Sequence, residues 1–198
     1  MTAPKTLFEL AGATPRPHPL AEAAVVMIDA QEEYLSGRLP LAGIEAALEE
    51  GARLLEAARA AGRPVVHVQH AGKPGGLFDP ESAFFAIAGP VAPRGGEAVV
   101  RKALPNAFAG TELDATLKGL GAQTLILGGF MTHMCVSATA RAALDHGYAC
   151  TILAPACATR DLPDGQGGVV PAAEIHRIEL AALSDRFAMI AGDLDQIV

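Results

Sequence analysis

Short runs of apolar residues recur along the chain and predict buried strands. Residues 24–28 form a continuous apolar run that ends at Asp29. Continuous rather than alternating apolarity is typical of a parallel strand that is covered on both faces. We expect further strands over residues 64–69, 99–102, 124–128, 150–153 and 187–191.

Helix-spaced apolar residues separate these strands. Residues 41–61 place Ile44, Leu48 and Leu55 on one face, and Gly62 ends the segment. We expect further helices over residues 111–119, 135–146 and 172–184. Alternation of strands and helices predicts a single-domain, three-layer α/β/α fold of the Rossmann-like kind, with an open, mainly parallel sheet of about six strands.

The segments outside this alternation divide the chain. Residues 1–22 contain four prolines and little periodicity, so we interpret them as an N-terminal arm that precedes one domain over residues 23–198. Residues 70–96 are rich in Gly and Pro, and a long loop of this kind often lines a site. A chain of 198 residues suits one sizeable core.

Composition and charge exclude several functions. Hydrophobic residues make up 51% of the chain, yet no run approaches the roughly 20 apolar residues that cross a bilayer. Neither a membrane span nor a signal peptide is expected, and we predict a cytoplasmic protein. The net charge is −7 without a block of like charges, which argues against nucleic acid as a partner. Three cysteines without a secretion signal argue against a disulfide framework.

Three residue types with complementary chemistry stand at or beyond predicted strand ends. The carboxyl ends of parallel strands share one edge of a sheet, where ligands bind. Cys135 opens a predicted helix, whose dipole would lower the pKa of the thiol and make it a nucleophile, whereas the alternative is a buried structural cysteine. Asp29 can act as a base, or simply cap a loop. Lys102 can hold a thiolate, or discourage edge pairing.

Together these residues supply the nucleophile, base and cation of a covalent hydrolase. Gln31, two residues after Asp29, either fixes the local backbone or touches substrate. Cys150 and Cys157 lie in or near a predicted strand and are expected to be core residues.

A wider set of residues resembles a known family over about 24–192. The similarity rests on residues 26–31 (Val-Met-Ile-Asp-Ala-Gln), Lys102 with 106–108 and 111–113, residues 128–136 (Gly-Gly-Phe-Met-Thr-His-Met-Cys-Val) and residues 139–148. In this ordered set the chain resembles the isochorismatase-like cysteine hydrolases, which include nicotinamidases and carbamoyl-amide hydrolases.

The resemblance implies a catalytic triad of Asp29, Lys102 and Cys135. It also implies a cis peptide between Phe130 and Met131, which would aim the N–H groups of Met131 and Cys135 at an oxyanion. Phe108 has family support as a pocket wall, and family members commonly form homodimers or homotetramers.

Two departures from the family pattern narrow the expected chemistry. Nicotinamidases carry an Asp-x-His zinc arrangement after the second strand, whereas this chain has Gln69-His70-Ala71-Gly72, so we predict no metal and no cofactor. Isochorismatases that cleave a vinyl ether lack the cysteine that is present here. His133 replaces an acid that nicotinamidases place two residues before the cysteine, and it either faces the pocket or has a structural role.

The sequence therefore predicts a hydrolase that acts on carbon–nitrogen bonds other than peptide bonds. Its substrate would be a small amide or carbamoyl compound, cleaved through a thioester on Cys135. Two alternatives remain at this point. One is an isochorismatase-type vinyl ether hydrolase that relies on Asp29, and the other is a small-ligand-binding or interaction protein with a vestigial site.

Overall fold

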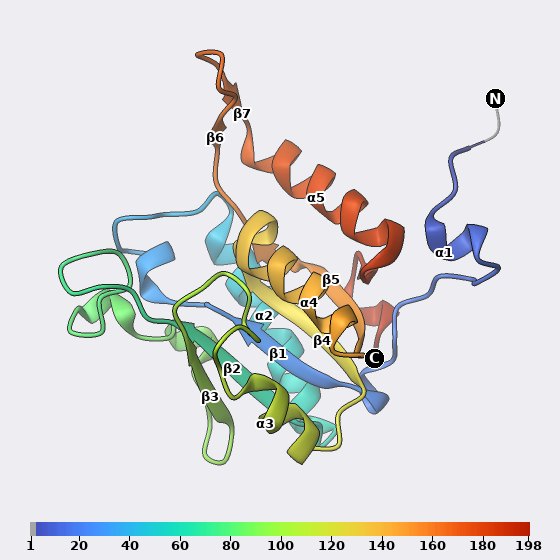
Figure 1. Cartoon of the computed structure of the whole chain (residues 1–198). Helices are drawn as coiled ribbons and strands as arrows, with labels where there is room; N and C mark the ends of the chain where they lie inside the picture. The colour runs from blue at the N-terminus through green and yellow to red at the C-terminus, as the bar shows by residue number, and fades with distance from the viewer. Residues whose placement is uncertain (1–2) are drawn as a thin grey trace.

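Six parallel strands form the central sheet of the protein. The computed structural model describes residues 3–198. The strand order is β3-β2-β1-β4-β5-β8 (Figure 1). The strands are β1 (Ala24–Ile28), β2 (Val65–His70), β3 (Ala98–Lys102), β4 (Thr124–Phe130), β5 (Ala149–Ala158) and β8 (Met189–Ala191).

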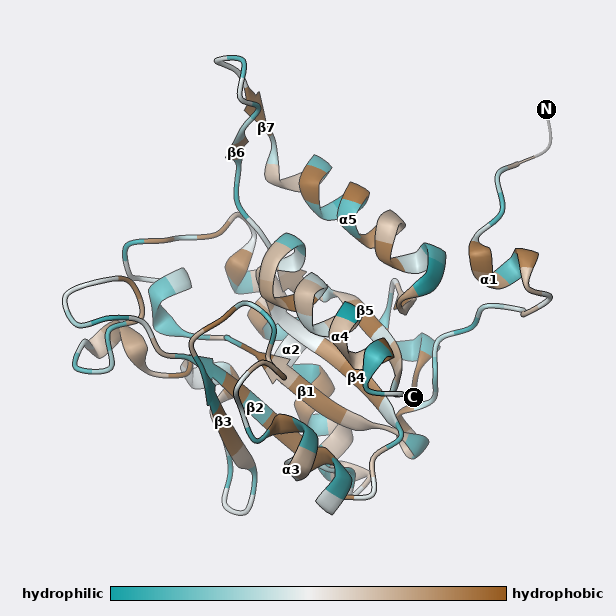
Figure 2. Ribbon diagram, in the orientation of Figure 1, coloured by the Kyte–Doolittle hydropathy of each residue, from teal (hydrophilic) through white to brown (hydrophobic). Residues whose placement is uncertain are grey.

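Helices cover both faces of this sheet. α2 (Ile44–Ala60) lies on one face, and α3 (Leu113–Gly119), α4 (Ser137–Asp145) and α5 (Ala172–Arg186) lie on the other (Figure 1). Apolar residues are concentrated in the strands between these layers, as Figure 2 shows. The predicted three-layer α/β/α fold is confirmed, and so is its parallel sheet.

The packing of the central strand β1 explains why its apolar run is continuous. Val25 and Met27 pack into the core beneath α2, whereas Val26 and Ile28 pack into the core beneath α3, α4 and α5. In register, Val26 lies between Val66 of β2 and Leu127 of β4. Because both faces are covered, polar residues are excluded from β1 until Asp29, where the strand reaches the edge of the sheet.

The segment around Cys135 differs from the predicted helix. A π-helical turn spans Thr132–Val136, and α4 begins only at Ser137. Cys135 therefore lies inside a wide turn rather than at the start of a regular helix. The Thr132 hydroxyl contacts Ala158 O and His176 of α5, which ties this turn to β5 and α5.

A small hairpin, β6 (Leu162–Pro163) with β7 (Val169–Val170), was not predicted. It projects from the body beside the start of α5 (Figure 1). Its strands are too short to show a period. The carboxylate of Asp164 instead shapes the turn, accepting hydrogen bonds from the N–H groups of Gln166 and Gly168.

The predicted N-terminal arm contacts α5 of the same chain. Its first two residues are outside the described range. α1 (Leu7–Leu10) begins with a capping box between Thr6 and Glu9. The Leu7 N–H donates to Asp185 of α5 at 2.8 Å, and Arg186 lies over the Phe8 ring.

The loop between β2 and β3 folds back toward the end of β1. It contains two short 3₁₀ turns, Ala83–Phe85 and Gly89–Val91. Backbone hydrogen bonds join Glu32 to Ala86 and Ala88 to Ala30, so the loop packs beside the residues that follow β1.

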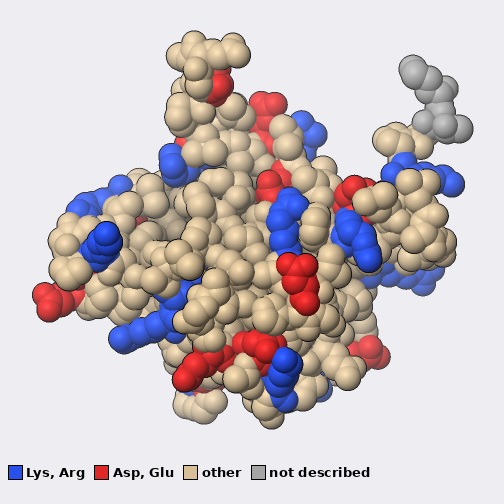
Figure 3. All heavy atoms as spheres, in the orientation of Figure 1, with Lys and Arg blue, Asp and Glu red and all other residues tan. Residues whose placement is uncertain are grey.

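Surface charges of both signs are interspersed over the face shown in Figure 3. None of the helices within residues 3–198 has the length and apolarity to cross a membrane.

Candidate active site

Asp29, Lys102 and Cys135 meet at the carboxyl edge of the sheet. The Lys102 ammonium nitrogen lies 2.6 Å from Asp29 Oδ2 and 3.3 Å from Cys135 Sγ. All three side chains are buried. The structure thus brings together the three residues that the sequence placed at or beyond strand ends.

The sheet accounts for this meeting. Asp29 directly follows β1, and its N–H donates to Val68 O of β2 at 2.8 Å. Lys102 is the last residue of β3, and β2 separates β3 from β1. Its long side chain therefore crosses the end of β2 to reach the carboxylate. A shorter side chain at this position would not span that strand.

Glycine brings the cysteine segment close to β1. Gly129 in β4 has φ +115°, and a Cβ atom there would lie 2.0 Å from Ile28 O. Only glycine fits that position without displacing β1. The peptide bond between Phe130 and Met131, which follows, is cis. The chain then enters the π turn that holds Cys135.

Burial and nearby charges determine the protonation states of Asp29 and Cys135. Burial raises the pKa of Asp29 to about 6, although the Lys102 ammonium opposes the shift. Burial raises the pKa of the Cys135 thiol to about 12; the charge of Asp29 adds to this and Lys102 opposes it. The expectation of a lowered thiol pKa is therefore wrong. The helix dipole is outweighed because the sulfur is desolvated and lies near a carboxylate.

These directions define the resting state of the site at neutral pH. Asp29 is a carboxylate paired with the Lys102 ammonium, and Cys135 is a neutral thiol that shares this ammonium. A base and a nucleophile with a proton to lose thus share one cation.

The side chain of Gln31 hydrogen-bonds to backbone groups rather than facing open space. Its amide oxygen accepts from the His70 N–H at 2.8 Å, and its amide nitrogen donates to His70 O at 3.1 Å and Phe85 O at 2.9 Å. Of the two roles that the sequence left open, the backbone role is the one these contacts support.

Phe108 and His133 also have partners within the protein. Phe108 is buried, and its ring stacks on His146 at 4.6 Å and on Tyr148 at 5.8 Å. His133 Nδ1 contacts the Thr159 hydroxyl. Burial lowers the pKa of the His133 imidazole, and the charge of Arg160 lowers it further.

Two residues near the site were given no role in it from the sequence, namely His70 and Arg160. His70 Nδ1 lies 3.0 Å from the Lys102 nitrogen. Burial raises the pKa of the Tyr34 hydroxyl, and the charge of Asp29 adds to this shift whereas Arg160 opposes it. His70 ends β2, and Arg160 lies two residues past β5, so their places at strand ends were the available signal.

The other two cysteines stand apart from this cluster. Cys150 and Cys157 are buried, and burial raises the pKa of each thiol to about 12. Cys157 Sγ donates a hydrogen bond to the Leu153 carbonyl oxygen at 3.5 Å. Their expected place in the core agrees with this burial.

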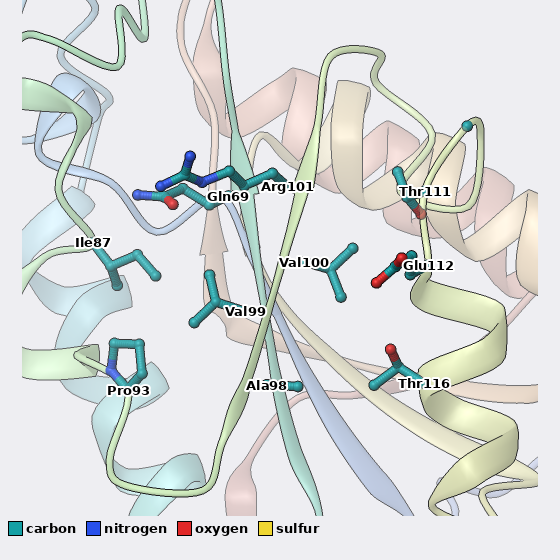
Figure 4. Close-up of a pocket in the computed structure, with 11 residues that line it drawn as sticks. Gln69, Ile87, Pro93, Ala98, Val99, Val100, Arg101, Thr111, Glu112 and Thr116 are labelled. Carbon is teal, nitrogen blue, oxygen red and sulfur yellow. The ribbon is translucent and has the colours of Figure 1, made fainter.

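A separate surface hollow lies along the edge strand β3. Gln69, Val99 and Arg101 are among its lining residues, and Figure 4 shows it on either side of the strand. Its volume is about 830 Å³. No cysteine lines it. Arg101 lines it, whereas the neighbouring Lys102 reaches the buried site. We therefore locate the chemistry at Cys135.

The donor atoms for a metal ion are not assembled in the described part of the chain. Within residues 3–198, no group of three or more His, Cys, Asp or Glu side chains has a metal-binding arrangement. His70, which occupies the segment where nicotinamidases bind zinc, instead contacts Lys102.

The fold and the site define an α/β protein with a buried Cys–Asp–Lys cluster at the carboxyl edge of a parallel sheet. Residues 23–192 match the isochorismatase domain model, and the chain belongs to the isochorismatase family of hydrolases. The resemblance inferred from the sequence is thereby confirmed.

Known relatives cover most of the chain. An isochorismatase from Pseudomonas putida KT2440, solved by crystallography, superposes with a TM-score of 0.94 at 46% identity, over 99% of this chain and 100% of that one. The secreted isochorismatase effector Isc1 of Verticillium dahliae is 36% identical over 93% of this chain and 95% of its own. A maleamate amidohydrolase of Pseudomonas putida is 34% identical over 63% of this chain and 67% of its own.

Proposed function

We propose that the protein is a cysteine-dependent hydrolase that cleaves the C–N bond of a small amide or carbamoyl compound through a thioester on Cys135. One observation carries this proposal: a single buried ammonium contacts both a carboxylate and a thiol. The name of the maleamate amidohydrolase, which acts on an amide, supports the same bond type.

The first half of the reaction forms the thioester. Asp29 takes the proton of Cys135 as the sulfur attacks the carbonyl carbon, so no free thiolate has to accumulate. Forming that thiolate first is unfavourable, because burial raises the pKa of the thiol well above that of Asp29. The Lys102 ammonium stays beside the sulfur while negative charge moves from Asp29 toward the substrate.

The first half ends when the amine leaves, and the second half releases the acid. The N–H groups of Met131 and Cys135 hold the oxyanion while Asp29 returns its proton to the amine, whose departure completes the thioester. The freed carboxylate then removes a proton from water, which attacks the thioester. The acid leaves and Cys135 regains its proton. No cofactor takes part in these steps.

Arg160 supports a substrate with an anionic end. Its Nε atom is buried without a hydrogen-bond partner among residues 3–198, and its guanidinium acts electrostatically on Tyr34 and His133. The charge of Asp29 acts on the same Tyr34 hydroxyl. In this proposal a substrate carboxylate pairs with Arg160 and the amide carbonyl of the same molecule reaches Cys135.

The proposal is tested with a panel of small amides and carbamoyl compounds, each with and without a carboxylate, measured by ammonia release. For the best substrate, Cys135→Ala should abolish turnover and the matched Cys150→Ala variant should retain it. Mass spectrometry should detect an acyl adduct on Cys135 after rapid quenching. Wild-type turnover by Cys135→Ala would refute the mechanism, and the vinyl ether hypothesis would then gain support.

Arg160→Gln separates the two parts of the proposal. We expect it to raise KM for the carboxylated substrates by about 10-fold or more and to leave neutral amides nearly unchanged. Equal effects on both substrate classes would remove the anionic preference and leave the cysteine mechanism intact.

A further inference from the structure

The Lys102 ammonium has a third partner besides Asp29 and Cys135. Its nitrogen lies 3.0 Å from Nδ1 of His70. A lysine ammonium carries three N–H donors and no acceptor. Asp29 Oδ2, Cys135 Sγ and His70 Nδ1 therefore match its three donors one to one.

The fold places His70 for this contact. His70 ends β2, and Lys102 is its register partner in β3. Gln31 bonds both the N–H and the carbonyl oxygen of His70 through one side-chain amide. The imidazole packs edge-on against Phe78, with ring centres 5.1 Å apart. The backbone and the ring of His70 are thus both held.

We propose that His70 is a positioning residue that directs the Lys102 ammonium at the sulfur of Cys135. With its third N–H taken up by Nδ1, the ammonium cannot rotate away from the thiol toward other acceptors. Gln31 belongs to the same arrangement, because it fixes the backbone of His70. The consequence for turnover rests on the proposed function, whereas the effect on the thiol does not.

An imidazole suits this position because it accepts a hydrogen bond without adding negative charge. The charged and titratable groups around it are Lys102, Asp29 and Cys135, with Glu33 behind Phe78, where its carboxylate accepts the Phe78 N–H at 3.0 Å. A second carboxylate here would compete with the forming thiolate for the ammonium. Burial, and then the charge of Lys102, lower the pKa of His70 to about 4, so it is neutral at pH 7 with its proton on Nε2.

The test compares variants that keep or remove the acceptor. His70→Asn can place its amide oxygen near the position of Nδ1, whereas His70→Leu has similar bulk and no acceptor. His70→Ala is a second acceptor-free variant in case the leucine variant does not fold. Two quantities are measured on each folded variant, the rate of Cys135 alkylation by iodoacetamide across pH 7–10 and kcat with the best amide. Thermal unfolding reports stability.

We expect the acceptor-free variants to lose about 10–100-fold in kcat and to alkylate Cys135 more slowly at each pH. His70→Asn should recover most of both losses. The proposal is overturned if His70→Leu or His70→Ala alkylates like the wild type, or if His70→Asn is no better than they are. Alkylation needs no substrate, so this outcome is independent of whether the amide hydrolase proposal holds.

Discussion

Removing the carboxylate of Asp29 should make Cys135 more reactive toward a simple electrophile while it abolishes hydrolysis. In the structure Asp29 raises the pKa of the thiol and Lys102 lowers it. The two variants Asp29→Asn and Lys102→Met should therefore shift that pKa in opposite directions. This result separates the role of Asp29 as a base from any role in holding a thiolate.

The size of the effect of Asp29→Asn on the thiol pKa follows from the geometry. Asp29 Oδ2 and Cys135 Sγ contact the same nitrogen at 2.6 and 3.3 Å. Because both atoms contact this nitrogen, they lie at most about 6 Å apart, a distance at which two unit charges interact by about 3 kcal/mol at an effective dielectric of about 20, or about two pKa units. Each unit of pKa decrease gives about 3–4-fold faster alkylation, because nucleophilicity falls as the thiolate fraction rises. Asp29→Asn should thus react about 10-fold faster.

The effect of Lys102→Met on the thiol pKa is partly cancelled. At the same effective dielectric, an ammonium 3.3 Å from the sulfur stabilises the thiolate by about 5 kcal/mol, or nearly four pKa units. Without that cation, however, the buried Asp29 takes up a proton at neutral pH and stops opposing the thiolate. Lys102→Met should therefore raise the thiol pKa by roughly two units and slow alkylation about 10-fold.

The assay follows iodoacetamide labelling at several pH values between 7 and 10, in a background that lacks Cys150 and Cys157. Glu33→Gln is the matched control, since it removes another buried carboxylate that follows β1 and should change the rate less than about 2-fold. Slower labelling in Asp29→Asn would refute the electrostatic account of the site. It would mean that the carboxylate supports the thiolate instead of raising its pKa.

Three further outcomes follow from the structure. Because Asp29 must be ionised to act as a base and burial raises its pKa to about 6, kcat/KM should fall as the pH decreases through about 6; a flat profile down to pH 5 would exclude it as the base. Exhaustive chelation should leave turnover and melting temperature unchanged, and loss of either on removal of a bound metal would contradict the predicted metal independence. Gly129→Ala should lower the free energy of unfolding by about 3 kcal/mol or more, measured by urea denaturation, because its Cβ would collide with Ile28 O; a wild-type midpoint would contradict that packing.

Much of the architecture was determined by the sequence. The continuous apolar run before Asp29 predicted a strand with both faces covered, and the structure places helices on both sides of it. Once the sheet was parallel, the positions of Asp29 and Lys102 at strand ends were enough to place them on one edge. The continuous apolar runs and the order of the elements are enough for this placement, and both can be read along the chain.

The ionisation of Cys135 was decided by tertiary structure. The sequence placed its thiol at a helix start, but the chain forms a π turn there and buries the sulfur near a carboxylate from a distant strand. The contact of His70 with Lys102 likewise depends on two strands being neighbours in register. Desolvation and charge separation are set by side chains that meet only after folding, because their Coulomb energies depend on distances of a few ångströms that sequence spacing does not encode.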